Sequence, residues 1–455
     1  MRPGVAAGHP ATCQAGFEIL EEGGSAADAA VAAGLASCVA ETVMTGLLGG
    51  GHAVYWDGER ARNLDCFVSV PSGRGGEMLE LRVPFGAELV HYAVGPASFA
   101  VPGVPAGLGV LWREYGRLPW ARLVEPALRL AEGVPLPPAH ARCLEMLAPV
   151  MTMNEGARIY APGGRLLSDG DLLRQPGLAR ALELLRDEGP ESVYSGTIAD
   201  AIVGLCSERG GLVTRDDLVR YHAHWVDRIE VPYAGTRFVT RGGLAGVAEA
   251  LARLAPLKGR PEAERVAALI HALDDDASGP ETHTTNLVAV DRDGHACVLT
   301  TSLGLGSGDF LPGLDLHLNS MLGEVDLVRG PLESGARMAS MMAPSLAVDD
   351  DGLALAIGSA GGTRLRTALV GVAAGILDEG LDLQEAVDRP RFHPVARLLN
   401  AEPGVPEAAL AALREDGWSV RVWPDRHHYF GGVSAIGRSG PAADPRRSGS
   451  ARALH

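Results

Sequence analysis

The 455-residue sequence has almost no lysine, few aromatic residues and no excess of positive charge. Lys258 is the single lysine among 40 basic residues, aromatic residues account for 5% of the chain, and 56 acidic residues give a net charge of −16. Nucleic acids and anionic membrane surfaces are bound mainly through lysine and arginine. The charge balance therefore argues against a nucleic acid or a membrane surface as the main partner.

Paired cysteines and long hydrophobic runs are also missing. The six cysteines include no C-x-x-C pair, which in a chain of this length predicts reduced, mostly buried thiols in a reducing compartment. The N-terminus has no apolar segment of the signal-peptide kind, and no run of about 18 uncharged apolar residues follows. We therefore expect a cytoplasmic protein without a membrane span.

The common catalytic and metal-binding motifs are absent too. The sequence has no G-x-S-x-G elbow, no Walker A sequence and no H-E-x-x-H. The acidic triplets at 274–276 and 349–351 are typical of solvated turns. The adjacent residues His427 and His428 would point apart in a strand, which disfavours a joint metal site. We expect no metal and no cofactor.

What is present is an ordinary globular composition, 46% hydrophobic and 21% charged. A chain of this length can bury roughly three-quarters of its unfolded surface. Apolar spacing with Gly or Pro breaks predicts helices in the first 45 residues and again between about 105 and 222. The expected helices are 10–22, 25–41, 105–115, 120–132, 178–187 and 198–206, with a capping box at 214–217.

The texture changes near residue 284. Two strand pairs are expected there, 286–290 with 295–301 and 345–348 with 353–357, each around an Asp- and Gly-containing turn. A glycine-rich stretch at 358–362 follows, and then a helix to about Leu377. Strand pairs with helices on both sides predict an α+β layered sandwich and not a doubly wound sheet. The region 240–283 is poor in pattern.

Two segments could carry chemistry. The glycine-rich stretch 358–362 before a helix can present backbone N–H groups to negative charge, either as an oxyanion hole or as a phosphate cradle, or it is a plain turn. No Lys or Ser/Thr stands at the offset of a nucleotide site, which favours the oxyanion hole. The threonine-rich segment 282–286 by itself reads as a strand start.

The segment 284–294, TTNLVAVDRDG, resembles the processing site of the γ-glutamyltranspeptidase family, in which a threonine, a strand and a D-x-D-G-type turn open the small subunit. The resemblance extends over nearly the whole chain and is specific through the order and spacing of its motifs. The other matching motifs are 8–10, 23–30, 49–51, 101–103, 115–120, 358–362, 390–393 and 444–447.

The resemblance implies an N-terminal-nucleophile hydrolase with a four-layer αββα sandwich. The precursor would cut itself between His283 and Thr284, leaving a large subunit 1–283 and a small subunit 284–455 that together form one structural domain. The freed α-amino group of Thr284 would then serve as base for its own hydroxyl, because such an amine titrates near 7.7–8.0.

By the same resemblance, Gly361 and Gly362 would donate N–H groups to the oxyanion, and Ser302 would hold the nucleophile by a hydrogen bond where the family has a second threonine. The substrate contacts depart from the family. Phe67 stands where an arginine grips the substrate carboxylate, and Gly304 replaces an asparagine. Glu324 keeps an acid for the substrate amine on a longer arm, and the serine pair becomes Ser340-Met341.

The sequence thus predicts a self-processing amidohydrolase or acyltransferase that uses an acyl-enzyme on Thr284 and no cofactor. Its partner would be a small molecule, either a γ-glutamyl compound bound differently or another amide, such as an acylated amino compound. A non-catalytic, uncleaved relative that serves as a binding scaffold is the alternative from another class. A homo-oligomer is possible on this reading.

Overall fold

Two antiparallel sheets lie face to face at the centre of the molecule. The computed structural model describes residues 1–85, 88–274 and 284–455. The first sheet has the strand order β22-β1-β11-β12-β2-β3-β8. Its strands are β22 (Ser450–Ala453), β1 (Gly4–Ala7), β11 (Thr285–Val290), β12 (Ala296–Ser302), β2 (Gly50–Trp56), β3 (Ala61–Cys66) and β8 (His224–Val226).

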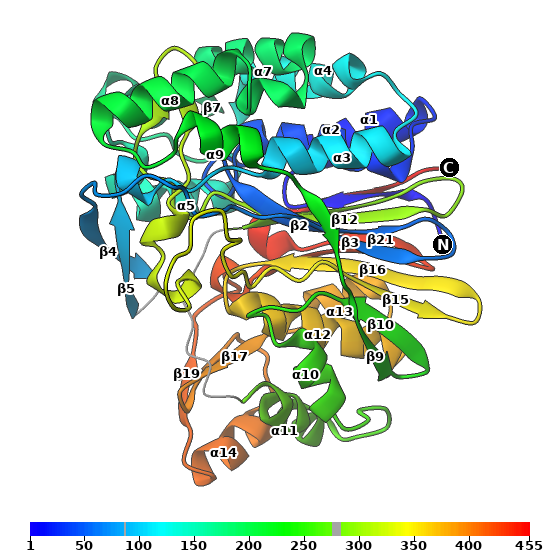
Figure 1. The fold of residues 1–455 in the computed structure, drawn as a ribbon. Helices are drawn as coiled ribbons and strands as arrows, with labels where there is room; N and C mark the ends of the chain where they lie inside the picture. The colour runs from blue at the N-terminus through cyan, green and yellow to red at the C-terminus, as the bar shows by residue number, and fades with distance from the viewer. Residues whose placement is uncertain (86–87, 275–283) are drawn as a thin grey trace.

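The second sheet has the order β21-β20-β16-β15-β10-β9. Its strands are β21 (Gly440–Ala443), β20 (Gly432–Gly437), β16 (Gly352–Ala360), β15 (Ser345–Asp349), β10 (Thr236–Thr240) and β9 (Ile229–Tyr233). Figure 1 shows the two sheets edge-on as the middle layers of the molecule.

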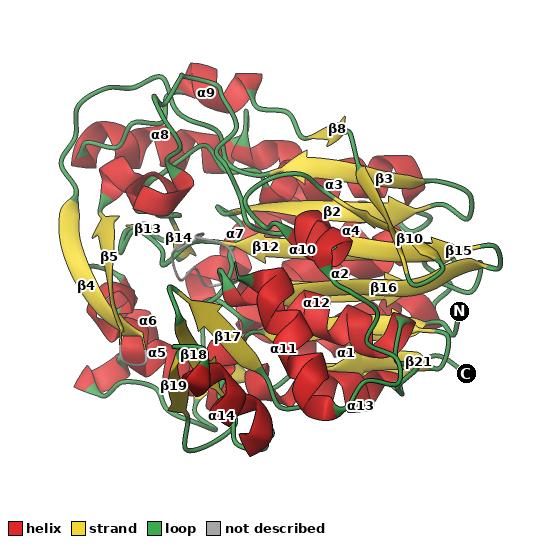
Figure 2. Cartoon of the chain, turned by 90° about the horizontal axis from the view of Figure 1, so that it is seen from below, coloured by secondary structure: helices red, strands yellow, loops and turns green. Residues whose placement is uncertain are grey.

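Helices cover both outer faces (Figure 1). The first sheet is covered by α1 (Pro10–Glu21), α2 (Ala26–Ala40), α3 (Val104–Tyr115), α4 (Trp120–Ala131), α7 (Pro176–Glu188), α8 (Thr197–Arg209) and α9 (Arg215–Arg220). The second sheet is covered by α10 (Val247–Arg253), α11 (Glu262–Leu273), α12 (Arg364–Leu377), α13 (Leu383–Asp388) and α14 (Glu407–Glu415). Figure 2 looks through this second helical layer onto the strands. The four layers confirm the predicted αββα sandwich.

Strand β11 shows why the sequence builds these layers. Successive side chains of a strand point to opposite faces, and here Leu287 and Ala289 pack against the first helical layer, whereas Val288 and Val290 pack between the two sheets. Both faces of the strand are covered, so it reads as an uninterrupted apolar run. The strand is therefore fully buried, and it carries Thr284 at its N-terminal end into the interior.

Smaller elements flank the sandwich. They are the hairpin β4 (Leu79–Phe85) with β5 (Glu88–Val94), the pair β6 (Val134–Pro135) with β7 (Leu172–Leu173), the pair β13 (Phe310–Leu311) with β14 (Leu316–His317), the helices α5 (Pro138–Met151) and α6 (Gly156–Tyr160), and a sheet of β17 (Phe392–Val395), β18 (Leu398–Ala401) and β19 (Ser419–Val422). In the described part of the chain, no helix is both long and apolar enough to cross a membrane.

Most predicted elements are confirmed within a few residues. Ser25 caps α2 through a capping box with Asp28, and Thr214 caps α9 in the same way with Asp217. The predicted hairpins are β11–β12 and β15–β16. The pattern-poor region 240–283 contains α10 and α11, which the sequence analysis did not resolve. All six cysteines are buried free thiols.

Candidate active site

Thr284 directly precedes β11 and is 2% exposed. It lines a cavity, which we call the front cavity. Most residues predicted to form the site surround this cavity together with apolar residues that the sequence analysis did not name. Its lining residues are Phe67, Thr284, Ser302, Met321, Glu324, Leu327, Ser340, Met341, Met342, Gly362 and Leu365. The predicted scissile partner, His283, lies outside the described residues.

Ser302 reaches the cavity from the end of β12, the strand that pairs with β11. Its hydroxyl oxygen accepts a hydrogen bond from the Gly304 amide at 3.0 Å. The neighbouring glycine run 49–51 is explained by crowding, since a Cβ at Gly49 would lie 2.2 Å from the Ser302 carbonyl oxygen. The glycines thus allow the loop before β2 to press against the strand end that carries Ser302.

Gly361 and Gly362 form the turn between β16 and α12. Their φ angles are +126° and +56°, a region that side chains disfavour and glycine adopts readily. Backbone N–H groups of such a turn can form a concavity that attracts negative charge. Gly362 lines the front cavity, and Gly361 lies next to it on the chain. The structure thus brings this turn to the front cavity, and the oxyanion hole stays a prediction.

Phe67 gives the front cavity an apolar wall. The side chain is 1% exposed, and its ring stacks on the buried His52 ring with centroids 5.5 Å apart. Its carbonyl oxygen accepts hydrogen bonds from Tyr221 at 2.6 Å and from Arg337 at 3.1 Å. Burial, with the nearby Arg241 and Arg337, holds the pKa of His52 well below its usual value.

No arginine is among the described residues that line the front cavity. Arg62 is engaged at the surface with Glu114 and Tyr115. Arg241 lies behind the wall, where it donates to the carbonyl oxygens of Ser340 and Met342 at 3.3 and 3.1 Å. A substrate carboxylate in this cavity would therefore face Phe67 without the cationic partner that the family pattern supplies.

Glu324 is the acidic residue of the front cavity. It is 1% exposed, and neither carboxylate oxygen has a hydrogen-bond partner among the described residues. Burial, helped by Asp326, raises the pKa of this carboxyl to about 8. Gly304 makes room for it, because a Cβ there would lie 2.2 Å from Glu324 Oε1. Burial thus favours the protonated acid, which can donate a hydrogen bond.

Asn319 fixes the loop that carries Met321 and Glu324. Its amide group donates to the carbonyl oxygens of Leu48 and Ala100 at 2.8 and 2.9 Å. Its carbonyl oxygen accepts from the Ala100 and Met321 amides. Asn319 is 0% exposed and does not line the cavity, so its hydrogen bonds set the shape of the wall.

Ser340 and Met341 both line the front cavity. The Ser340 hydroxyl accepts from the Met342 amide at 3.2 Å, which ties it to its own loop. The side chains of Met341 and Met342 are 7% and 5% exposed. Methionine is flexible and polarisable, so this side of the cavity can adapt to apolar groups of different shape.

A second cavity, which we call the rear cavity, also contacts Thr284. Glu41, Met44, His140, Thr285 and Arg447 are among its lining residues. Arg447 Nη1 donates to the Thr284 carbonyl oxygen at 3.3 Å. Burial raises the pKa of Glu41 to about 7, although hydrogen bonds from Thr12 and Thr285 and the charge of Arg447 oppose the rise. No sequence motif predicted a role for Glu41 or Arg447.

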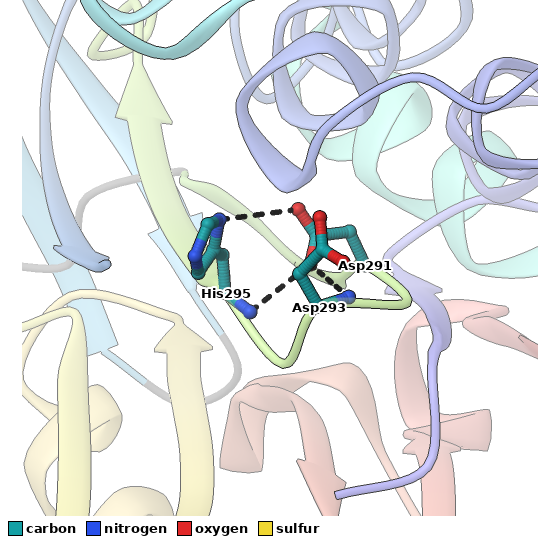
Figure 3. Close-up of side chains that lie close together, drawn as sticks. All are labelled: Asp291, Asp293 and His295. Carbon is teal, nitrogen blue, oxygen red and sulfur yellow. Dashed lines mark hydrogen bonds and ion pairs between the residues drawn. The ribbon is translucent and has the colours of Figure 1, made fainter. Parts of the chain in front are cut away.

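The best cluster of metal-type ligands among the described residues lies elsewhere. Asp291, Asp293 and His295 gather at the turn between β11 and β12, the far end of the hairpin from Thr284 (Figure 3). Arg117 pairs with both carboxylates, and Asp291 already accepts from the Ala26, Asp293 and His295 amides at 3.0 Å. These contacts satisfy the acidic groups, so the cluster stabilises the turn between the two strands.

The expectation that His427 and His428 point apart is wrong. Both lie at a short 3-10 turn, not in a strand, and their ring centroids are 4.1 Å apart. His427 Nδ1 accepts from the Tyr429 amide at 3.1 Å. The pair belongs to an aromatic cluster with Trp423 and Tyr429, and it is not among the metal-type groups found in the described residues.

The four-layer architecture is that of an N-terminal-nucleophile hydrolase fold, and Thr284 directly precedes one of its central strands. Comparison with known proteins gives the family. The family model for Gamma-glutamyltranspeptidase matches residues 12–273 and 248–454, and the chain belongs to this family. Its relatives include both acylases and glutathione hydrolases, so the family membership supports an amide or acyl hydrolase activity.

Three of the similar proteins show the range. The Acylase ACY 1 proenzyme of Pseudomonas sp. (strain V22) is 28% identical over 95% of this chain and 89% of that protein. Glutathione hydrolase proenzyme 1 of Schizosaccharomyces pombe is 26% identical over 96% of this chain and 81% of that protein. The crystal structure of cephalosporin acylase from Bacillus halodurans superimposes with a TM-score of 0.86 at 25% identity, covering 100% of this chain and 96% of that one.

Proposed function

We propose that this protein is a self-processing amide hydrolase of the acylase type, with Thr284 as its nucleophile. The observation that carries the proposal is the front cavity, where Thr284, Ser302 and Gly362 meet an apolar wall. On this proposal the chain is cut between His283 and Thr284 into residues 1–283 and 284–455. The resulting α-amino group and the hydroxyl of Thr284 then act as base and nucleophile on one residue.

The chemistry follows from these groups. The Thr284 hydroxyl attacks the carbonyl carbon of the substrate amide and gives its proton to the α-amine. Backbone N–H groups of Gly361 and Gly362 stabilise the negative charge that develops on the carbonyl oxygen. The C–N bond breaks as the α-amine returns the proton to the leaving amine. Water then hydrolyses the ester on Thr284 and releases the acid.

The character of the wall favours an apolar acyl group as donor. Phe67, Met321, Leu327, Met341, Met342 and Leu365 line the cavity, and burying apolar surface contributes about 25 cal/mol per Å². A γ-glutamyl donor carries a charged carboxylate. Without a bidentate contact to an arginine, binding of this carboxylate is weaker by a few kcal/mol. The similarity to proteins named acylases supports the same choice.

The γ-glutamyl compound remains the second candidate because Glu324 keeps an acid in the cavity. A panel of anilides separates the two donors. Simple acyl anilides should give a kcat/KM at least about tenfold above that of γ-glutamyl anilide and glutathione. Efficient glutathione hydrolysis by the wild-type protein would reverse the assignment. Addition of amine acceptors to the same assay measures transfer against hydrolysis.

Thr284→Ala tests the nucleophile. The purified wild type should give two bands on a denaturing gel, near two-thirds and one-third of the mass, and the variant should stay a single inactive chain. Normal subunits in the variant would move the scissile bond elsewhere, with Thr282 or Thr285 next in line. A single band and no turnover for the wild type on every amide tested would instead support the non-catalytic scaffold.

A further inference from the structure

Glu41 occupies an unusual position behind Thr284. It follows α2 directly as the C-cap residue of that helix and is 1% exposed. A carboxylate is unfavourable at a helix C-terminus, where the backbone dipole is negative, and its burial adds a desolvation cost. A residue that is unfavourable on both counts is expected at a functional or strained site.

The two carboxylate oxygens of Glu41 bind two different hydroxyl groups. Oε1 accepts from Thr12 Oγ1 on α1 at 2.6 Å, and Oε2 accepts from Thr285 Oγ1 at the start of β11. Thr285 is joined to Thr284 by one peptide bond, and Arg447 Nη1 donates to the carbonyl oxygen of that same bond at 3.3 Å. Glu41 therefore holds the side chain of Thr285, and Arg447 holds the carbonyl oxygen of the peptide unit that joins Thr285 to the nucleophile.

Such a brace matters most after the proposed cleavage. The first residues of a chain are poorly ordered unless they are tied down, and Thr284 would become a first residue. Thr285 also pairs with Thr301 in the sheet, which fixes its backbone, whereas the Glu41 contact fixes its side chain. Misplacing a reacting group by about 1 Å can lower a rate by about a hundredfold.

We propose that Glu41 is a positioning residue for Thr284, which it holds through the hydroxyl group of Thr285 while Arg447 holds the Thr284 carbonyl oxygen. The proposal rests on the proposed function of Thr284. It differs from the predicted part of Ser302, because Glu41 lines the rear cavity and Ser302 lines the front cavity. Loss of the brace should therefore lower kcat and leave substrate binding nearly unchanged.

Gly8 supports this reading. A Cβ at Gly8 would lie 2.8 Å from Glu41 Oε2 and 2.9 Å from Thr285 Oγ1, directly against both partners of the hydrogen bond. Gly8→Ala therefore disturbs this contact without removing a polar group. It provides a second variant that acts on the same bond by a different physical route.

Thr12 and Thr285 offer a matched pair for the test. Thr12→Val and Thr285→Val each remove one buried hydroxyl bond to Glu41, but only Thr285 adjoins the nucleophile. We expect the Tm of both variants to fall by a similar amount. The kcat of the processed Thr285→Val enzyme should fall about tenfold or more, whereas its KM should stay within about twofold of the wild-type value. Thr12→Val should keep kcat within about twofold, and Thr285→Ser should recover most of the wild-type kcat.

Each outcome decides the proposal. Equal kcat in wild type, Thr285→Val and Gly8→Ala would overturn it, as would an equal kcat loss in Thr12→Val. A folded Thr285→Val chain that no longer cleaves itself would support it, since self-cleavage needs the same placement of Thr284. If Thr285→Val does not fold, the kcat of Gly8→Ala tests the proposal: a reduced kcat supports it, and a wild-type kcat overturns it. Thr284→Ala, measured alongside, separates the failures: an active Thr284→Ala refutes the proposed function and not merely the positioning by Glu41.

Discussion

At the scale of single residues, we expect Phe67 to set which substrates the front cavity can hold. Its ring is buried against His52 and lines the front cavity. Phe67→Arg should raise kcat/KM for γ-glutamyl anilide relative to simple acyl anilides by about tenfold, because one charged hydrogen bond contributes about 1.5–3 kcal/mol. The recovery should be incomplete, since Met341 and Gly304 remain.

Phe67→Met is the matched control for this change. It removes the ring without adding charge, so the ratio between the two donors should stay near that of the wild type. The measurement is kcat/KM for both anilides at one pH. A Phe67→Met enzyme that gains γ-glutamyl activity as strongly as Phe67→Arg would show that cavity volume, and not charge, sets the preference.

Glu324 makes the stability of the protein depend on pH. Its pKa rises from 4.5 to about 8 on folding, so between these values the folded state holds a proton that the unfolded chain has released. The free energy of unfolding therefore falls as pH rises through this window, by up to about 1.4 kcal/mol per pH unit. Tm of Glu324→Gln should consequently fall less than that of the wild type between pH 5 and pH 8.

Glu333→Gln serves as control, because Glu333 is exposed and the variant should follow the wild-type curve. Thermal unfolding at four or five pH values provides the measurement. Parallel Tm curves for wild type and Glu324→Gln would mean that the Glu324 carboxyl finds a partner in solution and ionises normally.

At the scale of an element, we expect the two ends of the β11–β12 hairpin to have different roles, one in stability and one in catalysis. Asp291 at its turn accepts three backbone N–H bonds, and Ser302 lies at its opposite, cavity end. Asp291→Ala leaves buried donors unpaired and should cost about 1–3 kcal/mol of stability, with kcat changed by less than about twofold. Ser302→Ala should have the reverse effect, a kcat loss above about tenfold with little change in Tm.

Adding Ca²⁺ or EDTA completes this experiment. Because Arg117 and the backbone already satisfy the acidic groups of the turn, neither reagent should change the Tm of the wild type. A Tm increase with Ca²⁺ that disappears in Asp291→Ala would show that the cluster in Figure 3 binds a cation after all.

Elements with local signals were predictable, and contacts between distant segments were not. The capping residues Ser25 and Thr214 and the acidic turns of the two hairpins marked element boundaries directly. Helix α10 has seven residues, and its stability comes from packing on the second sheet, which no local pattern reveals.

The site divides in the same way. Phe67, Ser302, Glu324 and Gly362 could be named because each stands in a recognisable motif, and the structure places them around one cavity. Glu41 bonds to Thr285, which lies 244 positions away in the sequence. Its proposed positioning role therefore depends on a tertiary contact that no local pattern shows. One signal was visible: an acidic residue ends an otherwise alanine-rich helix, against the helix dipole.

The proposed subunits are interleaved at the scale of the whole molecule. In the first sheet, β1 of the large subunit lies between β22 and β11 of the small subunit, and β12 pairs with β2. In the second sheet, β15 pairs with β10. Both sheets and the three apolar clusters that pack on and between them thus contain residues from both proposed subunits. Neither subunit can therefore bury its apolar residues alone.

Cleavage should therefore leave one particle. Native gel filtration of the processed protein should give a single species containing both chains in equal amount, with a mass of 47.4 kDa or a multiple of it. The chains should separate only when denaturant unfolds the sandwich, and separately purified chains should not regain activity on mixing. Release of the smaller chain in buffer would contradict the interleaved boundary.

The edge of the first sheet brings the two chain ends together. Gly4 pairs with Ala453, and the Leu454 amide donates to the Pro3 carbonyl oxygen at 2.9 Å. The markers of the two chain ends lie on the same side of the molecule in Figure 1. A short linker could therefore close the ends and let the gene be rearranged so that translation begins just before Thr284. Removal of the initiator methionine would then expose the threonine directly. Such a circular permutant would present the proposed nucleophile without any self-cleavage, so that its chemistry could be studied apart from the proposed cleavage step.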